Sequence, residues 1–139
     1  MTVEEAIKRS GTRNILAKGS TKKTQQMIQP NEEVLYAINT NVIVKNINTS
    51  ISLMKNKING IFCITNKRIL FCSSILGTLN QKQINIKDIV AIEDYTNGLT
   101  KMGQIAIKGI TEIFLIDIYK SNLVDEIKEC IYKVQNIEE

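Results

Sequence analysis

The stretch GIFCITNKRILFCSS, Gly60–Ser74, decides the fold that the rest of the sequence predicts. Its cysteines suggest a reactive thiol site, its basic pair suggests a nucleic-acid contact, and its two apolar runs suggest a β-hairpin. The runs, Ile61–Thr65 and Arg68–Ser74, each have the length of a strand, and Asn66 tolerates the backbone conformation that a tight turn requires. The pattern therefore favours a hairpin with Asn66-Lys67 as its two-residue loop.

A two-residue loop fixes which side chains face each other across this hairpin. One face pairs Phe62 with Phe71 and Ile64 with Ile69, and the other pairs Cys63 with Leu70 and Ile61 with Cys72. Because the two cysteines do not face each other, we expect no disulfide between the strands. Burial of each phenylalanine stabilises the hairpin by roughly 1.5–3 kcal/mol.

The chain of 139 residues has the length of one domain, and its apolar fraction of 43% and charged fraction of 23% are ordinary for a globular protein. The densest apolar run, Ile113–Ile116, is far shorter than the ~20 residues of a membrane-spanning helix. The N-terminal MTVEEAIKRS lacks the continuous apolar segment of a secretory signal. We therefore expect a cytoplasmic protein.

The sequence contains no histidine, which is the usual general base and the commonest metal ligand. Its serines and thiols then have no histidine to activate them as nucleophiles. The cysteines, Cys63, Cys72 and Cys130, follow no CxxC spacing, and we expect all three to be buried free thiols. The sequence predicts no catalytic residue, no metal site and no cofactor, and so a protein that is not an enzyme.

The net charge of +4 is unevenly divided along the chain. Residues 1–87 contain thirteen Lys and Arg against four Asp and Glu, a balance of +9, whereas residues 88–139 contain five against ten, a balance of −5. The basic residues are scattered without aromatic residues between them, which is not the pattern of a nucleic-acid-binding surface. One basic and one acidic half favour contact with an anionic partner or with a second copy of the chain.

Alternating apolar residues predict further strands on both sides of the hairpin. A strand over 34–44 precedes a polar loop over 45–57, and strands around 83–86, 89–96, 104–108 and 112–119 follow the hairpin. The short connections demand antiparallel pairing. Ser121 or Asn122 caps a final helix to about Asn136, whose apolar stripe is Leu123, Ile127, Ile131 and Val134. The predicted fold is mostly β, with seven antiparallel strands and one C-terminal amphipathic helix.

The first thirty residues lack a long apolar stripe. Thr2 followed by Glu5 has the form of a capping box, which predicts a short helix to about Arg9, and one or two helical turns follow before Pro30. We therefore divide the chain into a helical appendage over 1–30 and a domain over 31–139.

Seven strands followed by a helix is the element order of the pleckstrin-homology (PH) fold. Within that order, Gly60–Phe71 resembles the G-x-[LF]-x-x-T-[ND]-x-R-[LI]-[LI]-F signature of the short bacterial PH-like domains, and Ile84–Glu93 resembles the element that follows it. The resemblance covers residues 31–134 and implies a PH-like barrel capped by the helix. It assigns structural motif positions to Gly60, Thr65, Asn66, Arg68 and Phe71, of which Thr65, Asn66 and Arg68 form the turn and anchor of the hairpin.

The resemblance leaves the function open, because one fold serves many functions. Domains of this fold bind proteins or phosphoinositides, and we rank first a non-catalytic interaction module that binds another protein or itself, by strand addition at a sheet edge. The alternative is an anionic lipid or phosphate ligand in the loop between the first two strands, although a membrane lipid is the less favoured partner. The contacts for such a ligand are Lys45, Lys55, Lys57 and Arg68. Nucleic acid is not an expected partner.

Overall fold

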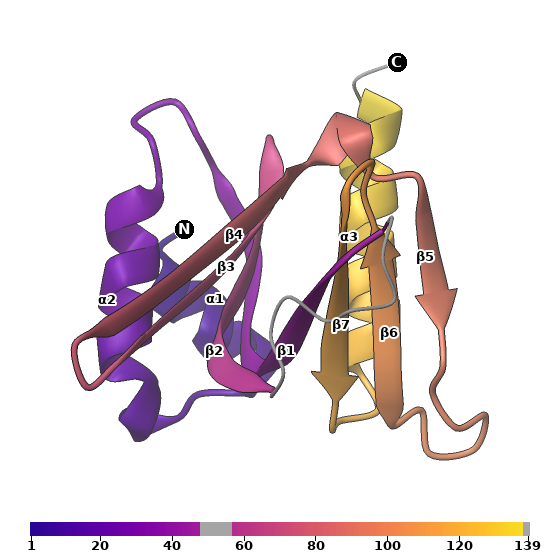
Figure 1. Ribbon diagram of the computed structural model, residues 1–139, viewed down its shortest axis with the longest axis horizontal. Coiled ribbons are helices and arrows are strands. Elements are labelled where there is room, and N and C mark those ends of the chain that lie inside the picture. Colours follow the sequence, from indigo (N-terminus) through magenta and orange to yellow (C-terminus); the bar gives the residue numbers. More distant parts are fainter. Residues whose placement is uncertain (48–56, 138–139) are drawn as a thin grey trace.

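The computed structural model describes residues 1–47 and 57–137 of the chain. In this part of the chain seven antiparallel strands form one sheet in the order β4-β3-β2-β1-β7-β6-β5 (Figure 1). The strands are β1 (Val34–Asn46), β2 (Ile58–Thr65), β3 (Arg68–Ile75), β4 (Thr78–Asn85), β5 (Ala91–Asp94), β6 (Gly103–Lys108) and β7 (Glu112–Ile118). The helices are α1 (Val3–Ser10), α2 (Lys18–Met27) and α3 (Leu123–Ile137), with 3-10 turns η1 (Ile15–Ala17) and η2 (Ile86–Asp88).

The long strand β1 belongs to both halves of the sheet. Its residues 34–42 pair with β2 and its residues 42–46 pair with β7, so that Val42 stands opposite both Ile58 and Ile116. Figure 1 shows the two resulting groups of strands, β1–β4 and β5–β7, set at an angle to each other. The predicted PH-like fold of seven antiparallel strands with a C-terminal helix is confirmed. The strand order leaves β4 and β5 at the two edges of the sheet.

The predicted hairpin of Ile61–Thr65 and Arg68–Ser74 forms with the predicted register. In β2 and β3, Phe62 stands opposite Phe71 and Ile64 opposite Ile69, while Cys63 stands opposite Leu70 and Ile61 opposite Cys72. All three cysteines are free, and the two in the hairpin are fully buried. The hairpin is therefore held by packing and backbone hydrogen bonds.

The main core lies between the two halves of the sheet and takes in α3. Leu123, Ile127 and Ile131 are completely buried there, and Val134 is 6% exposed. The helix begins at Leu123, directly after the predicted caps. Its apolar stripe therefore packs against the sheet as the sequence predicts.

A second core lies on the other face of the β1–β3 part of the sheet, under α1 and α2. It consists of Val3, Ala6, Ile7 and Ala17 from the N-terminal segment and Val34, Ala37, Ile61, Cys63 and Leu70 from the strands. The N-terminal thirty residues therefore pack closely on the sheet. This cover explains why the hairpin is apolar on both faces, since a strand that is buried on both sides needs no polar alternation.

Helix α2 approaches β3 through small residues. A Cβ on Gly19 would lie 3.2 Å from the Ser74 carbonyl oxygen, and Ser20 Oγ accepts a hydrogen bond from the Ser74 N–H at 2.9 Å. The first helix begins as predicted, because Thr2 Oγ1 accepts from the Glu5 N–H at 3.1 Å.

The strands predicted around 83–86 and 89–96 are present with other bounds. Strand β4 begins at Thr78, directly after a turn in which Leu76 and Gly77 take positive φ angles of 50° and 81°. Every residue of β4, including the polar first half of the strand, pairs with β3. Backbone pairing rather than apolar alternation therefore sets where β4 begins. The 3-10 turn Ile86–Asp88 then interrupts the chain, and β5 spans only Ala91–Asp94.

The loop between β1 and β2 begins later than the predicted residue 45. Strand β1 continues through Asn46, because Lys45 and Asn46 pair with β7 opposite Ile113 and Glu112. Residues 48–56 of the predicted loop lie outside the described residues.

Candidate interaction site

Arg68 is the centre of a hydrogen-bond cluster at the start of β3. Its Nε donates to Glu32 Oε2 at 2.8 Å and its Nη2 donates to Glu32 Oε1 at 2.9 Å, which makes a two-pronged ion pair. The same guanidinium donates to the Met27 carbonyl oxygen at 2.8 Å and to Gln83 Oε1. The side chains of Arg68 and Glu32 are 13% and 0% exposed. The cluster therefore joins the end of α2 to β3 and β4.

Thr65 and Asn66 join the same cluster from the turn of the hairpin. Thr65 Oγ1 donates to Glu32 Oε2 at 2.7 Å and accepts from the N–H groups of Lys67 and Arg68, each at 3.1 Å. Asn66 Oδ1 accepts from the Glu33 N–H at 2.8 Å. These contacts tie the turn to the segment that leads into β1.

The hydrogen-bond partners of Glu32 stabilise the ionised form of its carboxyl group, although the side chain is buried. Burial alone would raise the pKa of this carboxyl, but hydrogen bonds from Arg68, Thr65 and the Gln29 N–H outweigh it and hold the pKa below its ordinary value. The sequence analysis missed Glu32. The sequence contained a clue to this partner, because an arginine in a buried hairpin needs a carboxylate. Residues 1–87 contain four acidic residues that could supply it, Glu4, Glu5, Glu32 and Glu33.

The other two motif residues lie in the β2–β3 packing. A Cβ on Gly60 would lie 2.5 Å from the Cys72 carbonyl oxygen and 2.9 Å from the Phe71 ring, so this position accepts only glycine. The Phe71 side chain is completely buried in the main core.

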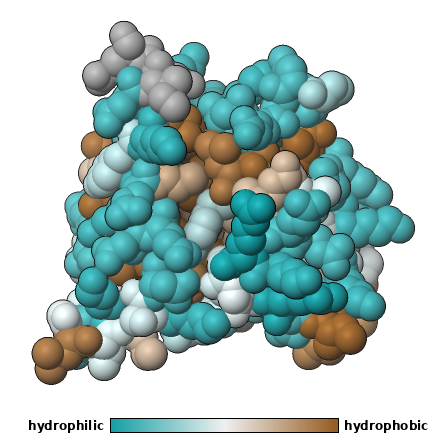
Figure 2. All heavy atoms as spheres, turned by 180° about the vertical axis from the view of Figure 1, so that it is seen from behind, coloured by the Kyte–Doolittle hydropathy of each residue, from teal (hydrophilic) through white to brown (hydrophobic). Residues whose placement is uncertain are grey.

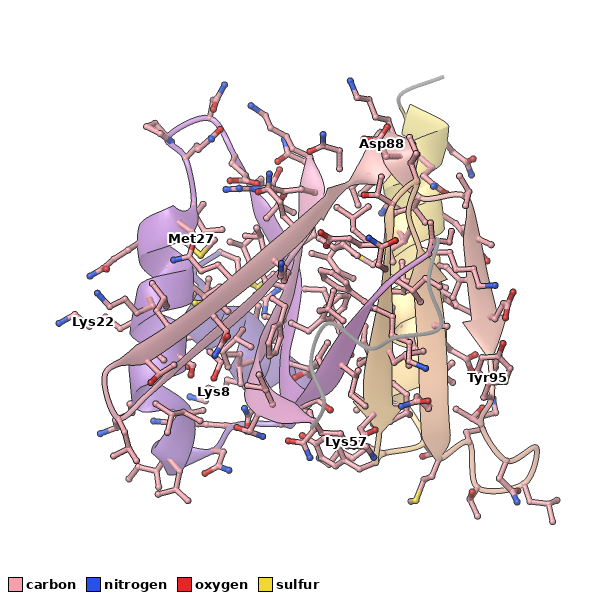
Figure 3. All side chains as sticks on the ribbon, viewed as in Figure 1. Lys8, Lys22, Met27, Lys57, Asp88 and Tyr95 are labelled. Atoms are coloured by element: carbon pink, nitrogen blue, oxygen red, sulfur yellow. The ribbon has the colours of Figure 1, made fainter. Side chains whose placement is uncertain are left out.

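The structure describes three of the four residues expected to contact an anionic ligand, and these three lie on different parts of the sheet. Lys45 is half-buried in β1, and Lys55 lies outside the described residues. Lys57 pairs with Asp117 at 3.0 Å, at the lower end of the view in Figure 3. Arg68 follows the far end of β2, and the eight residues of that strand separate it from Lys57.

The described residues supply no metal site and no membrane span. No group of three or more His, Cys, Asp or Glu side chains within 1–47 and 57–137 could hold a metal ion. In those same ranges, no helix is long and apolar enough to cross a bilayer.

Strand β4 is an edge with apolar side chains beside it. Ile75, Leu76 and Leu79, at the turn from β3 and the start of β4, are 47%, 100% and 46% exposed. In Figure 2, apolar (brown) surface appears at the lower right, at the end of the molecule where both this turn and η1 lie. Sheet edges are commonly protected by proline and by charged side chains, and β4 has no proline and one charged residue, Lys82. The edge can therefore accept another strand.

The sequence and the fold were compared with those of known proteins. The sequence model of the GRAM domain matches residues 18–136, most of the chain. The chain belongs to the GRAM domain family. GRAM domains have the PH-like fold, and domains of this kind are generally non-catalytic interaction modules that bind proteins or lipids. None of the curated proteins matches the chain.

Two solved structures agree with the GRAM assignment at the level of fold. The N-terminal PH domain of Vps36 is similar with a TM-score of 0.58 and 15% identity, covering 81% of this chain and 86% of that one. The truncated linker-DH/PH structure of p115-RhoGEF is similar with a TM-score of 0.54 and 6% identity. It covers 96% of this chain, which spans 38% of the p115-RhoGEF chain. The GRAM match begins at Lys18, the first residue of α2, and the domain boundary predicted between residues 30 and 31 stays a prediction.

Proposed function

We propose that this GRAM domain is a non-catalytic module that binds another protein, or a second copy of itself, through the free edge of β4. The observation that supports it is the eight-residue edge strand Thr78–Asn85, with the exposed Leu79 in the strand and the exposed Leu76 in the turn before it. A partner strand on this edge would gain a ladder of backbone hydrogen bonds, and the leucines would add apolar contact. The proposal includes a cytoplasmic location, no nucleic-acid partner and kinship with the short bacterial PH-like domains.

A pair of double variants tests this proposal. Leu79→Lys/Gln81→Lys places two added charges along the edge, whereas Val90→Lys/Leu99→Lys adds the same charge at exposed residues away from β4. Protein captured from the native cytoplasm by the wild type is expected to be lost with the edge variant and retained with the control. Light scattering behind a sizing column separates the two kinds of partner, because self-association gives a mass that falls with the edge variant alone. Equal capture by both variants would contradict the proposal.

The second candidate is an anionic lipid or phosphate ligand between β1 and β2. The observation in its favour is that Lys45 and Lys57 lie on the two sides of residues 48–56. Each lysine near an anionic membrane contributes on the order of 1 kcal/mol. If this candidate is right, the wild type sediments with anionic vesicles at low salt, and reversal of Lys45, Lys55 and Lys57 to Glu abolishes it. Absence of sedimentation by the wild type excludes this candidate.

A further inference from the structure

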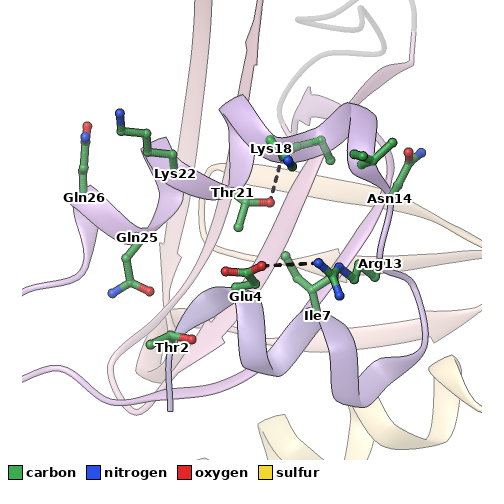
Figure 4. Close-up of a pocket in the computed structure, with 12 residues that line it drawn as sticks. Thr2, Glu4, Ile7, Arg13, Asn14, Lys18, Thr21, Lys22, Gln25 and Gln26 are labelled. Atoms are coloured by element: carbon green, nitrogen blue, oxygen red, sulfur yellow. Dashed lines mark hydrogen bonds and ion pairs between the residues drawn. The ribbon is translucent and has the colours of Figure 1, made fainter.

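We propose that the groove between α1 and α2 binds an acidic, amphipathic peptide segment of a partner protein. The groove encloses about 900 Å³ and is lined by residues of α1, η1, α2 and the segment between the first two (Figure 4). It lies on the N-terminal helices and does not include β4. It is therefore a second binding surface, beyond the strand edge of the proposed function.

The groove has an apolar floor and one apolar rim. Ile7 of α1 and Ala17 of η1 line it and are each 4% exposed, whereas Ile15 at the rim is 72% exposed. The neighbouring Leu16 is 88% exposed. Such a floor and rim can accept an apolar side chain of a docked segment.

Helix α2 forms one wall of the groove. Figure 4 shows Thr21 and Gln25 pointing from α2 toward α1, whereas Lys22 points away from α1 at the outer edge of the groove. Lys18 and Lys22 lie one helical turn apart along this edge. The opposite face of α2 is buried against the sheet. Gln25 Oε1 also accepts from the Val3 N–H at 2.8 Å, which links the two helices across the groove.

The groove carries a positive charge and therefore favours a negatively charged partner. Glu4 is the acidic residue among its described lining residues, and it pairs with Arg13 at 3.8 Å. Lys18 and Lys22 have no ion-pair partner within residues 1–47 and 57–137, and α2 contains no acidic residue. Two carboxylates one helical turn apart on a partner can therefore meet these two ammonium groups.

A peptide fits this groove better than a bilayer surface. The wall offers the amides of Asn14 and Gln25, whose oxygens accept from the Leu16 and Val3 N–H groups and whose NH2 groups can donate to a peptide backbone. The site is hollow, with its apolar residues at the floor as well as at the rim. A hollow of this size suits a short segment with one apolar anchor.

The test uses random 12-residue peptides displayed on phage and selected on the full-length protein. We expect enriched peptides to carry two or more Asp or Glu residues and a large apolar residue within about two helical turns. For a fluorescein-labelled enriched peptide, Lys18→Glu/Lys22→Glu should weaken binding about tenfold or more. The matched control, Lys8→Glu/Lys23→Glu, changes the charge equally at exposed positions outside the groove and should stay within about twofold. If circular dichroism shows that the first variant unfolds, Lys18→Gln/Lys22→Gln replaces it.

The outcomes separate this site from its rivals. Enrichment without acidic residues, no enrichment, or equal weakening by both charge-reversal pairs overturns the proposal. Sedimentation with phosphatidylserine–phosphatidylcholine vesicles that depends on Lys18 and Lys22, without peptide binding, assigns the groove to membranes and also overturns it. The edge variant Leu79→Lys/Gln81→Lys should bind the peptide like the wild type. A result that contradicts peptide binding in the groove therefore does not contradict strand addition at β4, and a result that contradicts strand addition does not contradict peptide binding.

Discussion

At the scale of single residues, the pair of Arg68 and Glu32 connects several elements of the fold. Their ion pair links the end of α2, the turn of the hairpin and β4 through Met27, Thr65 and Gln83. The Thr, Asn and Arg of the hairpin signature were predictable as the turn and its anchor, because their spacing matches a known motif. Glu32 was not predicted, because it lies far away in sequence in a segment without regular apolar periodicity.

Glu32→Gln tests this pair. The substitution leaves the nearly buried guanidinium without its counter-charge and should lower the free energy of unfolding by about 3–5 kcal/mol. Because the folded pKa of Glu32 is below the unfolded value of 4.5, its contribution is full above that value and is lost as the pH falls through the folded pKa. Urea unfolding as a function of pH should show the two proteins converging below pH 4.5. The exposed neighbour provides the control, since Glu33→Gln should change stability by under about 0.5 kcal/mol.

The thiols give a second test at this scale. Burial raises the pKa of Cys63 to about 12 and of Cys130 to about 11, and it also raises the pKa of Cys72. Few thiolates are then present at neutral pH, and the thiolate is the reactive form. Thiol titration should find little reaction in the native protein and three reactive groups after denaturation. Rapid native labelling of Cys63 or Cys72, or a disulfide in protein purified with reductant, would refute this prediction.

At the scale of elements, the predictions succeeded where a strong apolar pattern sets the structure. The hairpin and α3 have strong patterns, and both form with the predicted faces buried. Strand β4 has a polar first half, and α2 packs through Gly19 and Ser20. In both cases a neighbour supplies the pairing or the close approach, which the local sequence does not show.

Helix α3 gives the test at this scale. Ile127→Ala should lower the free energy of unfolding by about 2–5 kcal/mol, because the side chain is completely buried in the main core. Lys133→Ala, at an exposed position of the same helix, is the control. Deletion of residues 121–139 should leave an unfolded or aggregated chain. A soluble truncation with cooperative unfolding would show that the core does not need this helix.

At the scale of the whole molecule, the sheet is covered by α3 over one core and by α1 and α2 over the other. Apolar residues on both faces of the hairpin were a sign of this second cover, although the sequence analysis described residues 1–30 as an appendage. The strand order leaves β4 as the longer of the two edge strands. The proposed function depends on that edge.

Hydrogen exchange of the β4 backbone amides tests this central claim most directly. It is measured on the free protein and on the same protein with its captured partner bound, or at the concentration where light scattering shows self-association. Amides that face away from β3 in Thr78–Asn85 should exchange rapidly in the free protein and become protected in the complex. Unchanged exchange in β4, with protection appearing elsewhere in the chain, would contradict the claim.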